Sequence, residues 1–424
     1  MVAIEDVQVA PRRFFYGWII VGVAALAMVG TLPGRTQGLG LITEPLLAEF
    51  GISRLAYAQI NLFATLAGAL FAFGVGSWID RRGSRSVLTA LAIALGCVVV
   101  AMSRTTGPFM LLLAVTLTRG LGQTALSIVS LAMVGKWFRQ RLTWAMAIYA
   151  FAMSMGFMIA FPTIGALVLS AGWRDAWMTV GVALLFVLAP LSWFLVRSTP
   201  EEIDEEIDGM PRLKPGPSSH EDCDMRGRAV GRTNATLWDA LQSPAFWVFA
   251  IASAMYGLVA SGIGLFNEAV LAERRFAPDV YHNALAVTAI TGLGGNFAAG
   301  AWAERRSLRG VMVVAMAILS VALAALPHVR TTLEVMLQAV AMGIAGGFVM
   351  VVFFSFWGRT FGNTHLGRIQ GAAQMMTVVA SALGPLALAW SVESTGSYAT
   401  AFYALAVAVL MLGVSAAIVR LPRT

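Results

Sequence analysis

The sequence predicts an all-α membrane protein in which twelve transmembrane helices form two pseudo-symmetric six-helix bundles. Three observations predict this fold: the composition, a succession of long apolar segments and an internal repeat. Of the 424 residues, 58% are hydrophobic and only 12% are charged, and the mean hydropathy is +0.77. A soluble protein carries about 25% charged residues. Because this chain cannot cover itself with a water-facing surface at its size, lipid must solvate most of it.

Twelve segments are long and apolar enough to cross a bilayer, which takes roughly 20 mostly apolar residues. They are expected at Tyr16–Gly34, Leu55–Ile79, Val87–Met102, Phe109–Gly135, Trp144–Ala171, Ala176–Val196, Ala245–Leu265, Ala284–Ala303, Val311–Pro327, Val335–Trp357, Ile369–Val392 and Ala399–Val419. The first is about as long as a membrane span and lacks a small-residue cleavage site. It is therefore expected to remain as a helix and not to be removed as a signal peptide.

The basic residues predict the orientation of these helices. With the N-terminus in the cytoplasm, the cytoplasmic segments hold 21 Lys and Arg and the outer loops hold seven. This bias follows the positive-inside rule. We therefore expect a multi-pass protein of the cell inner (plasma) membrane with both termini in the cytoplasm. The same loops explain the net charge of +7, so the charge does not indicate a nucleic-acid partner.

One long polar stretch separates the two groups of six segments. It contains an acidic run that begins at Glu201, followed by a region rich in Pro, Gly and Ser. Such a composition is typical of a flexible tether, with a regulatory or partner-binding role as the alternative. The expected organisation is an N-terminal six-helix half over 1–197, a cytoplasmic linker over 198–243 and a C-terminal six-helix half over 244–424.

The two halves match at a constant offset of 224 residues. Over positions 38–85 and 262–309, 15 of 48 ungapped pairs are identical, and most of these are Gly, charged or aromatic. The pairs include Gly40 and Gly264, Glu44 and Glu268, Tyr57 and Tyr281, and Gly68 and Gly292. This pattern indicates a duplication. An even six-plus-six split predicts a parallel repeat, with its axis along the membrane normal and the substrate path between the halves.

The loop between the second and third expected helices carries the motif Gly76-Ser-Trp-Ile-Asp80-Arg81-Arg82-Gly83-Ser-Arg85. Gly76 would let a neighbouring helix approach closely, and Gly83 suits a tight turn. Asp80 can accept hydrogen bonds at a helix N-terminus, where the dipole favours an anion. The motif resembles the signature G-x-x-x-D-R-x-G-x-R of the major facilitator superfamily. Together with a second, altered copy, it predicts a cytoplasmic latch whose gating residues are Gly76, Asp80, Arg81, Gly83, Arg85, Glu304, Arg305 and Arg309.

Within that superfamily, the chain is similar to the monocarboxylate and oxalate–formate transporter group. The segment Phe15-Tyr16-Gly17-Trp18 and the segment from Pro33 to Gly38 resemble the start and end of that group's first helix. The resemblance implies that Arg35 engages a substrate carboxylate. The alternative is that Arg35 is a solvated charge in a loop. The chain departs from the group in its eighth span, Ala284–Ala303, which lacks the Arg often found there.

Polar residues recur at helical spacing within several spans, which marks faces turned away from lipid. Arg119 stands inside the fourth span, where an unpaired charge costs about 2.5–3.5 kcal/mol on insertion scales, so it must face water or a partner. Arg119 could contact the substrate or hydrogen-bond a neighbouring helix. The Ser and Thr hydroxyls of the spans could line a cavity or serve in helix packing. The candidate substrate-binding residues are Arg35, Gln37, Tyr57, Asn61, Arg119, Gln123, Tyr256, Thr291, Asn296 and Gln374. The eleventh helix is expected to break at Gly384-Pro385.

These features predict a secondary active or facilitative transporter that moves a small organic anion, a mono- or dicarboxylate, by alternating access. The alternatives are an exporter of a drug-like or other small solute and a non-transporting sensor of the same fold. No enzyme activity, metal or cofactor is expected, because the spans hold no nucleophile–base or metal-ligand set and the chain has no phosphate-binding Gly-Lys-Ser/Thr loop. The expected partners are the small-molecule substrate, a coupling proton or counter-anion, and the lipid bilayer around a monomer.

Overall fold

The computed structural model describes residues 15–138, 141–203, 205, 207, 235–305, 307–362 and 365–421, without the side chains of Asp80, Thr143 and Arg305. Within this part of the chain the secondary structure is helical, and no strand occurs. Twelve helical segments are long and apolar enough to cross a membrane, which confirms the predicted fold class. Lipid leaves backbone polar groups no water to bind, so a spanning segment must satisfy them internally, as a helix does.

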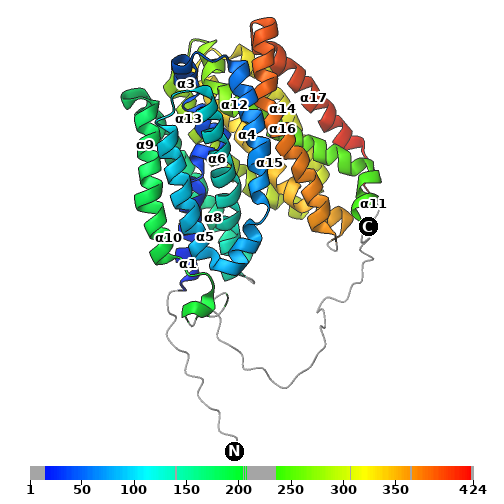
Figure 1. The fold of residues 1–424 in the computed structure, drawn as a ribbon. Helices are drawn as coiled ribbons and strands as arrows, with labels where there is room; N and C mark the ends of the chain where they lie inside the picture. Colours follow the sequence, from blue (N-terminus) through cyan, green and yellow to red (C-terminus); the bar gives the residue numbers. More distant parts are fainter. Residues whose placement is uncertain are drawn as a thin grey trace, which may run out of the picture.

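The N-terminal half contains the first six spans (Figure 1). Its helices are α1 (Gly17–Val29), α2 (Thr36–Gly40), α3 (Thr43–Phe50), α4 (Arg54–Ala69), α5 (Val75–Met102), α6 (Pro108–Thr118), α7 (Ser127–Trp137), α8 (Leu142–Ala171), α9 (Trp173–Ala183) and α10 (Ala189–Leu195). Two π-helical segments, Arg119–Leu126 and Leu184–Leu188, join α6 to α7 and α9 to α10. The fourth and sixth spans are therefore each interrupted by wider turns.

The C-terminal half is more regular, because each of its spans is one main helix. Its helices are α11 (Leu237–Gln242), α12 (Pro244–Ala272), α13 (Pro278–Arg305), α14 (Leu308–Ala325), α15 (Thr332–Phe361), α16 (Leu366–Thr395) and α17 (Ala399–Ile418). The short α11 begins with a capping box between Thr236 and Asp239. In this box each side chain hydrogen-bonds a backbone N–H group at the helix start.

Two expectations about helix ends were wrong. The second span does not continue to Ile79: the helical segment ends at Ala72 and a new helix begins at Val75. The chain breaks there because Gly74 has φ +89°, a conformation that costs glycine little. The eleventh span does not break at Gly384-Pro385 either, since α16 runs through Pro385 to Thr395.

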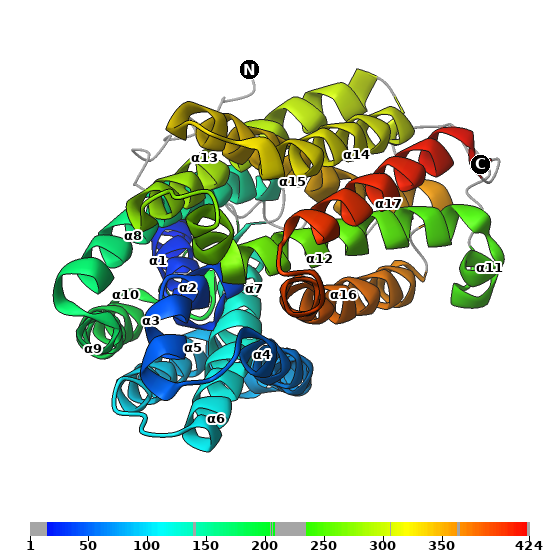
Figure 2. The ribbon, with the colours of Figure 1, turned by 90° about the horizontal axis from the view of Figure 1, so that it is seen from above.

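The two halves contact each other through their helices. Helix α4 packs against α16, and α8 packs against α13. We call the side where α1 begins, α10 ends, α12 begins and α17 ends the linker side, and the opposite side the far side. In Figure 1, α16 and α17 lean away from the N-terminal half towards the linker side. Figure 2, seen from above the view of Figure 1, shows the two bundles side by side, with α2 and α12 near their boundary.

The internal repeat is visible in corresponding turns of the two halves. Gly172 precedes α9 with φ +90°, and its mate Gly396 precedes α17 with φ +75°. In the N-terminal half, the Glu49 carboxylate accepts hydrogen bonds from the side chains of Trp173 and Arg174 at the start of α9. The offset of 224 residues therefore holds well beyond positions 38–85.

In the C-terminal half, the mate of Glu49 makes the corresponding contact. The Glu273 carboxylate accepts hydrogen bonds from the Ser397 hydroxyl at 2.6 Å and from the backbone N–H of Tyr398 at 3.4 Å. Both acids thus fasten the segment after the first helix of a half to the start of its last helix. The contact is retained although its donors have changed.

Candidate functional site

Arg119 is the centre of a buried hydrogen-bond network. Its side chain is 2% exposed. One terminal nitrogen, Nη1, donates to Thr36 Oγ1 at 2.8 Å and to Gln123 Oε1 at 2.7 Å. The other, Nη2, donates to Asn61 Oδ1 at 2.9 Å. Three predicted site residues, Asn61, Arg119 and Gln123, are therefore brought together, and Thr36 joins them.

The local backbone explains how Arg119 reaches these partners. It stands at the start of the π-helical segment Arg119–Leu126, and π-bulges occur frequently at functional sites. Helix α4 comes close because Gly68 has no side chain: a Cβ there would lie 2.8 Å from the Cβ of Arg119. The chain before α2 is equally close, since a Cβ at Gly34 would clash with the Thr118 carbonyl oxygen.

All three acceptors of Arg119 are neutral oxygens. Its Nε is buried and makes no hydrogen bond to any residue that the structure describes. The network therefore satisfies most of the guanidinium hydrogen bonds without neutralising its charge. A buried cation held in this way keeps an attraction for an anion near it, because the low local dielectric screens its field poorly.

Arg35 is differently placed. Its Nε donates to Thr31 Oγ1 at 2.7 Å, and its Nη2 lies 2.8 Å from Met28 Sδ. Because these partners come four and seven residues earlier, the side chain points back from the far side towards the middle of the membrane. The guanidinium carbon lies 5.2 Å from the centre of the Phe157 ring on α8. A thioether is a weak acceptor, so Arg35 retains donor capacity for a ligand.

Gln37 lies where the two halves touch. The Tyr281 hydroxyl donates to the Gln37 carbonyl oxygen at 3.3 Å and to the Gly264 carbonyl oxygen at 3.0 Å. Nearby, the hydroxyl oxygens of Thr36 and Ser261 are 3.4 Å apart across the same boundary. The Arg119 network is thus linked to the C-terminal half through Thr36.

Of the remaining substrate-binding candidates, only Tyr57 has a hydrogen bond to this network among the described residues: its backbone carbonyl oxygen accepts from Asn61 Nδ2 at 3.0 Å. Tyr57 is fully buried beside it. Tyr256 packs against Gly346 of α15, and the Thr291 hydroxyl donates to a carbonyl of its own helix. Asn296 has a buried Oδ1 with no partner among the described residues, and Gln374 is exposed. Tyr57 lies on α4, and the other four are spread over α12, α13 and α16 of the C-terminal half.

The motif of the predicted latch has a defined local geometry around Gly83. Gly83 has φ +77° and separates two helical stretches, as a tight turn requires. Ser198 fits against it and accepts a hydrogen bond from the backbone N–H of Arg85 at 3.4 Å. The Arg85 guanidinium carbon lies 4.2 Å from the centre of the Trp193 ring. These contacts join the motif to the end of the sixth span in the same half.

Two expectations for the latch were wrong in this conformation. Gly76 is exposed and a Cβ there would meet nothing within 4 Å, so no helix approaches it closely. The backbone at position 80 lies at the end of a helical stretch, before Gly83, and not at a helix N-terminus. The Asp80 side chain lies outside what the structure describes.

The other members of the latch are on or near the linker-side surface. Arg81 and Glu304 are exposed. Arg309 of the second copy donates to the Val419 carbonyl oxygen at 2.7 Å, which fastens α14 to the end of α17. The side chain of Arg305, like that of Asp80, is not described. The contacts expected between the charged residues of the latch therefore stay a prediction.

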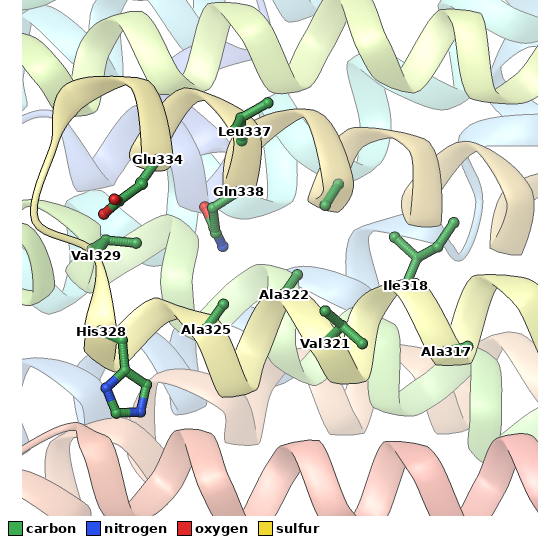
Figure 3. Close-up of a pocket in the computed structure, with 11 residues that line it drawn as sticks. Ala317, Ile318, Val321, Ala322, Ala325, His328, Val329, Glu334, Leu337 and Gln338 are labelled. Carbon is green, nitrogen blue, oxygen red and sulfur yellow. The ribbon is translucent and has the colours of Figure 1, made fainter.

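A separate groove of about 710 Å³ lies between α14 and α15 (Figure 3). Its lining includes none of the substrate-binding candidates. Val321 and Leu337 on its walls are 69% and 59% exposed. In a bilayer such apolar side chains face lipid, so we do not assign the groove to the substrate path.

Sequence comparison identifies the family. The model of the Major Facilitator Superfamily matches residues 18–271 and again residues 249–424. The chain belongs to the Major Facilitator Superfamily. It is therefore a multi-pass membrane transporter of a small solute, and this superfamily does not in general consist of enzymes.

Individual relatives within the superfamily are distant. The chain is 24% identical over 392 residues, 92% of its length and 89% of the relative's, to an uncharacterized 38 kDa protein in the 23S RNA operon of Thermoproteus tenax. It is 25% identical over 157 residues to a probable L-galactonate transporter of Escherichia coli strain K12, which covers 34% of each chain.

Solved structures share the fold. A bacterial homologue of the human lysosomal transporter Spinster, crystallised in an inward-facing and occupied conformation, has a TM-score of 0.71 with 14% identity and 96% coverage of both chains. The inward-facing, unoccupied form of such a homologue has a TM-score of 0.66 with 16% identity and 95% coverage. At these identities the likeness shows the superfamily fold alone.

Several residues at the candidate site were not predicted from the sequence. Thr31 and Thr36 were missed because single hydroxyls in spans are common in helix packing, whereas Ser261 belongs to the polar face that the sequence predicts for the seventh span. Spacing could have found two of the contacts: Thr31 precedes Arg35 by four residues, and Gln123 follows Arg119 by four. Residues four apart are neighbours on a helix surface.

Proposed function

We propose that this superfamily member carries a small organic anion, a mono- or dicarboxylate, across the cell inner membrane by alternating access. The observation that carries the proposal is Arg35. It is half-buried, contacts one hydroxyl and one thioether, and has no carboxylate partner among the described residues. A guanidinium with free donors matches the planar geometry of a carboxylate.

Arg119 also favours an anionic substrate, but without contacting it directly. Its terminal nitrogens are occupied by three protein oxygens, so it holds the helices together and supplies a positive field. Arg35 makes the direct contact. The partial match to a probable L-galactonate transporter also supports an anionic substrate.

In this proposal both termini are cytoplasmic and the linker side faces the cytoplasm. The contacts between Gln37 and Tyr281 then close the outer side, and the substrate enters or leaves from the cytoplasm. The transporter acts as a monomer and couples the anion to a proton or to a counter-anion. Movement of the two halves about their boundary exposes Arg35 to each side in turn.

The test is uptake and binding with the purified protein in proteoliposomes, using labelled mono- and dicarboxylates beside sugars, amino acids and amphiphilic cations. Arg35→Ala should weaken anion binding by about 1.5–3 kcal/mol, the usual contribution of a hydrogen bond to a charged group. This corresponds to roughly 10- to 100-fold in Kd. Arg35→Lys should recover part of the affinity, because the charge stays while the fork is lost.

Arg104→Ala is the matched control, since Arg104 is an exposed arginine in the loop before α6. It should leave affinity unchanged. If Arg35→Ala folds and carries a carboxylate with wild-type affinity, the anion site is elsewhere. Transport of amphiphilic cations without carboxylates would favour the drug-exporter alternative. Ligand binding without flux would favour the sensor.

A further inference from the structure

The groove between α14 and α15 has an apolar body and one polar end. Its volume of about 710 Å³ lies in the range of pockets that enclose a small-molecule ligand. Alanines line both walls of the apolar body: Ala317, Ala322 and Ala325 on α14 and Ala341 on α15. Because these side chains are short, the two helices leave between them a space that lipid hydrocarbon can fill.

The polar end of the groove lies on the far side, where α15 begins. Glu334 is exposed and stands in the first turn of that helix. Its Oε2 accepts hydrogen bonds from the backbone N–H groups of Arg330 at 2.6 Å and Thr331 at 3.3 Å. Among the described residues, its Oε1 has no hydrogen-bond partner and the exposed Arg330 guanidinium has no ion pair. One negative and one positive group are therefore open to a ligand at this end.

Gln338 lies one turn deeper, about 6 Å further along α15. Its Nε2 is buried and donates to no residue that the structure describes. Figure 3 shows this side chain extending from α15 towards α14, with Ala325 opposite it. A buried amide donor without an acceptor is unfavourable. A ligand with an oxygen acceptor at this depth would satisfy it.

The internal repeat shows that a lipid-facing surface does not need these polar groups. The offset of 224 residues pairs the beginnings of α6 and α15. It places Met110 at the position of Glu334 and Ala114 at the position of Gln338. The N-terminal half thus has apolar side chains where the C-terminal half has a carboxylate and an amide. The polar end is a feature of the C-terminal half and not of the shared fold.

We propose that this groove binds one phosphatidylethanolamine molecule through its headgroup as well as its chains. From the membrane surface inwards, this lipid presents an ammonium and a phosphate, then ester carbonyl oxygens, then acyl chains. The groove presents complementary groups in the same order. Glu334 Oε1 accepts from the ammonium, the Arg330 guanidinium donates to the phosphate, and Gln338 Nε2 donates to an ester carbonyl oxygen. An acyl chain fills the apolar body.

The Glu334 carboxylate distinguishes this lipid from two other common phospholipids. Phosphatidylglycerol has a net negative charge and no ammonium, so the carboxylate repels it. Phosphatidylcholine carries a positive charge, but its trimethylammonium has no N–H group to donate. Of the three headgroups, the primary ammonium alone can both neutralise the carboxylate and form a charge-assisted hydrogen bond with it. This binding does not depend on the proposed substrate.

The experiment measures lipid binding to the purified full-length protein by native mass spectrometry. Delipidated protein in detergent is titrated with phosphatidylethanolamine, phosphatidylcholine or phosphatidylglycerol that carry identical acyl chains. We expect the first phosphatidylethanolamine to bind roughly 10-fold or more tightly than either of the others, the effect of one hydrogen bond to a charged group. Equal Kd values for the three lipids would overturn the proposal, because the headgroup would then play no part.

A charge-neutralising variant locates the headgroup. Glu334→Gln removes the charge but keeps the capping of α15, since glutamine can take the place of glutamate in a capping box. It should lose the preference for phosphatidylethanolamine. Glu393→Gln is the matched control, because Glu393 is an exposed acid at the far-side end of α16, and it should keep the preference. If Glu334→Gln keeps the wild-type preference, the headgroup binds elsewhere and the proposal is wrong.

A second variant tests the groove itself. Ala325 is exposed in the groove opposite Gln338, so Ala325→Phe places a ring where the lipid would lie. It should bind phosphatidylethanolamine roughly 10-fold or more weakly, because both headgroup and chain contacts are obstructed. Its melting temperature in lipid-free detergent should remain that of the wild type. A folded Ala325→Phe protein with wild-type affinity would refute the site. Glu334→Gln decides the question if Ala325→Phe does not fold.

Discussion

Replacing Asn61 tests whether Arg119 is held by the network described above. Asn61→Ala removes the acceptor of Arg119 Nη2, which lies 2.9 Å away. The loss of one hydrogen bond to a buried charged group costs roughly 1.5–3 kcal/mol, because the donor cannot turn to water instead. We therefore expect the free energy of unfolding to fall by about this amount.

The assay is equilibrium unfolding in mixed micelles, with Thr65→Ala as the matched control. Thr65 is one turn further along α4, and its hydroxyl donates to the Asn61 backbone carbonyl oxygen at 2.7 Å. That neutral bond should contribute only about 0.5–1.5 kcal/mol. A double-mutant cycle with Arg119→Met isolates the shared term, and we expect Asn61→Ala and Arg119→Met to be non-additive by about 1.5 kcal/mol or more. Additive losses would refute the network, because they would mean that Arg119 and Asn61 act independently.

Three further outcomes are expected. Cysteines at the exposed positions Ser53 and Ser394 should react with an impermeant thiol reagent from outside intact cells, whereas labelling of the native linker cysteine would overturn the orientation. The hydrogen bond from Arg174 lowers the pKa of the Glu49 carboxyl. The contact between Glu49 and Arg174 is therefore complete at neutral pH and is lost as the pH falls through that lowered pKa. Glu49→Gln should reduce the acid sensitivity of the melting temperature. Tyr281→Phe should shift the contact between the halves at Gln37 and Tyr281 towards the open state by roughly 2- to 10-fold, the effect of one neutral hydrogen bond. Tyr57→Phe should not, because the Tyr57 hydroxyl faces residues of its own half. Labelling of a Ser261→Cys variant in intact cells with an impermeant thiol reagent measures both, because Ser261 lies at the same boundary.

The fold was predictable because lipid permits few alternatives. A chain with 58% hydrophobic residues in twelve long segments has no other way to satisfy its backbone in a bilayer than as helices. The ends of the helices were less predictable, since local backbone conformation decides them. Gly74 ends the second span early through its positive φ, whereas Pro385 leaves α16 continuous. Hydropathy contains neither piece of information.

The candidate site was predictable only where a residue was out of place in lipid. Arg119 could be singled out because a charge inside a span demands a partner, and the amides of Asn61 and Gln123 because they are hard to bury unpaired. The direction of the Arg35 side chain could not be predicted. Spacing placed its Cα near the edge of the membrane, but its contact with Thr31 turns the guanidinium inwards. That contact depends on where α1 ends, which periodicity does not fix.

The repeat clarifies why the proposed anion site belongs to one half. A Cβ on Gly68 would meet Arg119, and in the other half a Cβ on its mate Gly292 would meet Gly343, which the offset of 224 pairs with Arg119. The helix packing is thus retained while the cation is not. The same offset relates each member of the polar network to an apolar residue or glycine: Arg35 to Val259, Thr36 to Ala260, Asn61 to Leu285 and Gln123 to Gly347. A bound carboxylate would therefore stay with the N-terminal half, and the C-terminal half would move past it. Closure then needs no second fixed cation in the C-terminal half, where the offset of 224 places Val259 and Gly343 at the positions of Arg35 and Arg119.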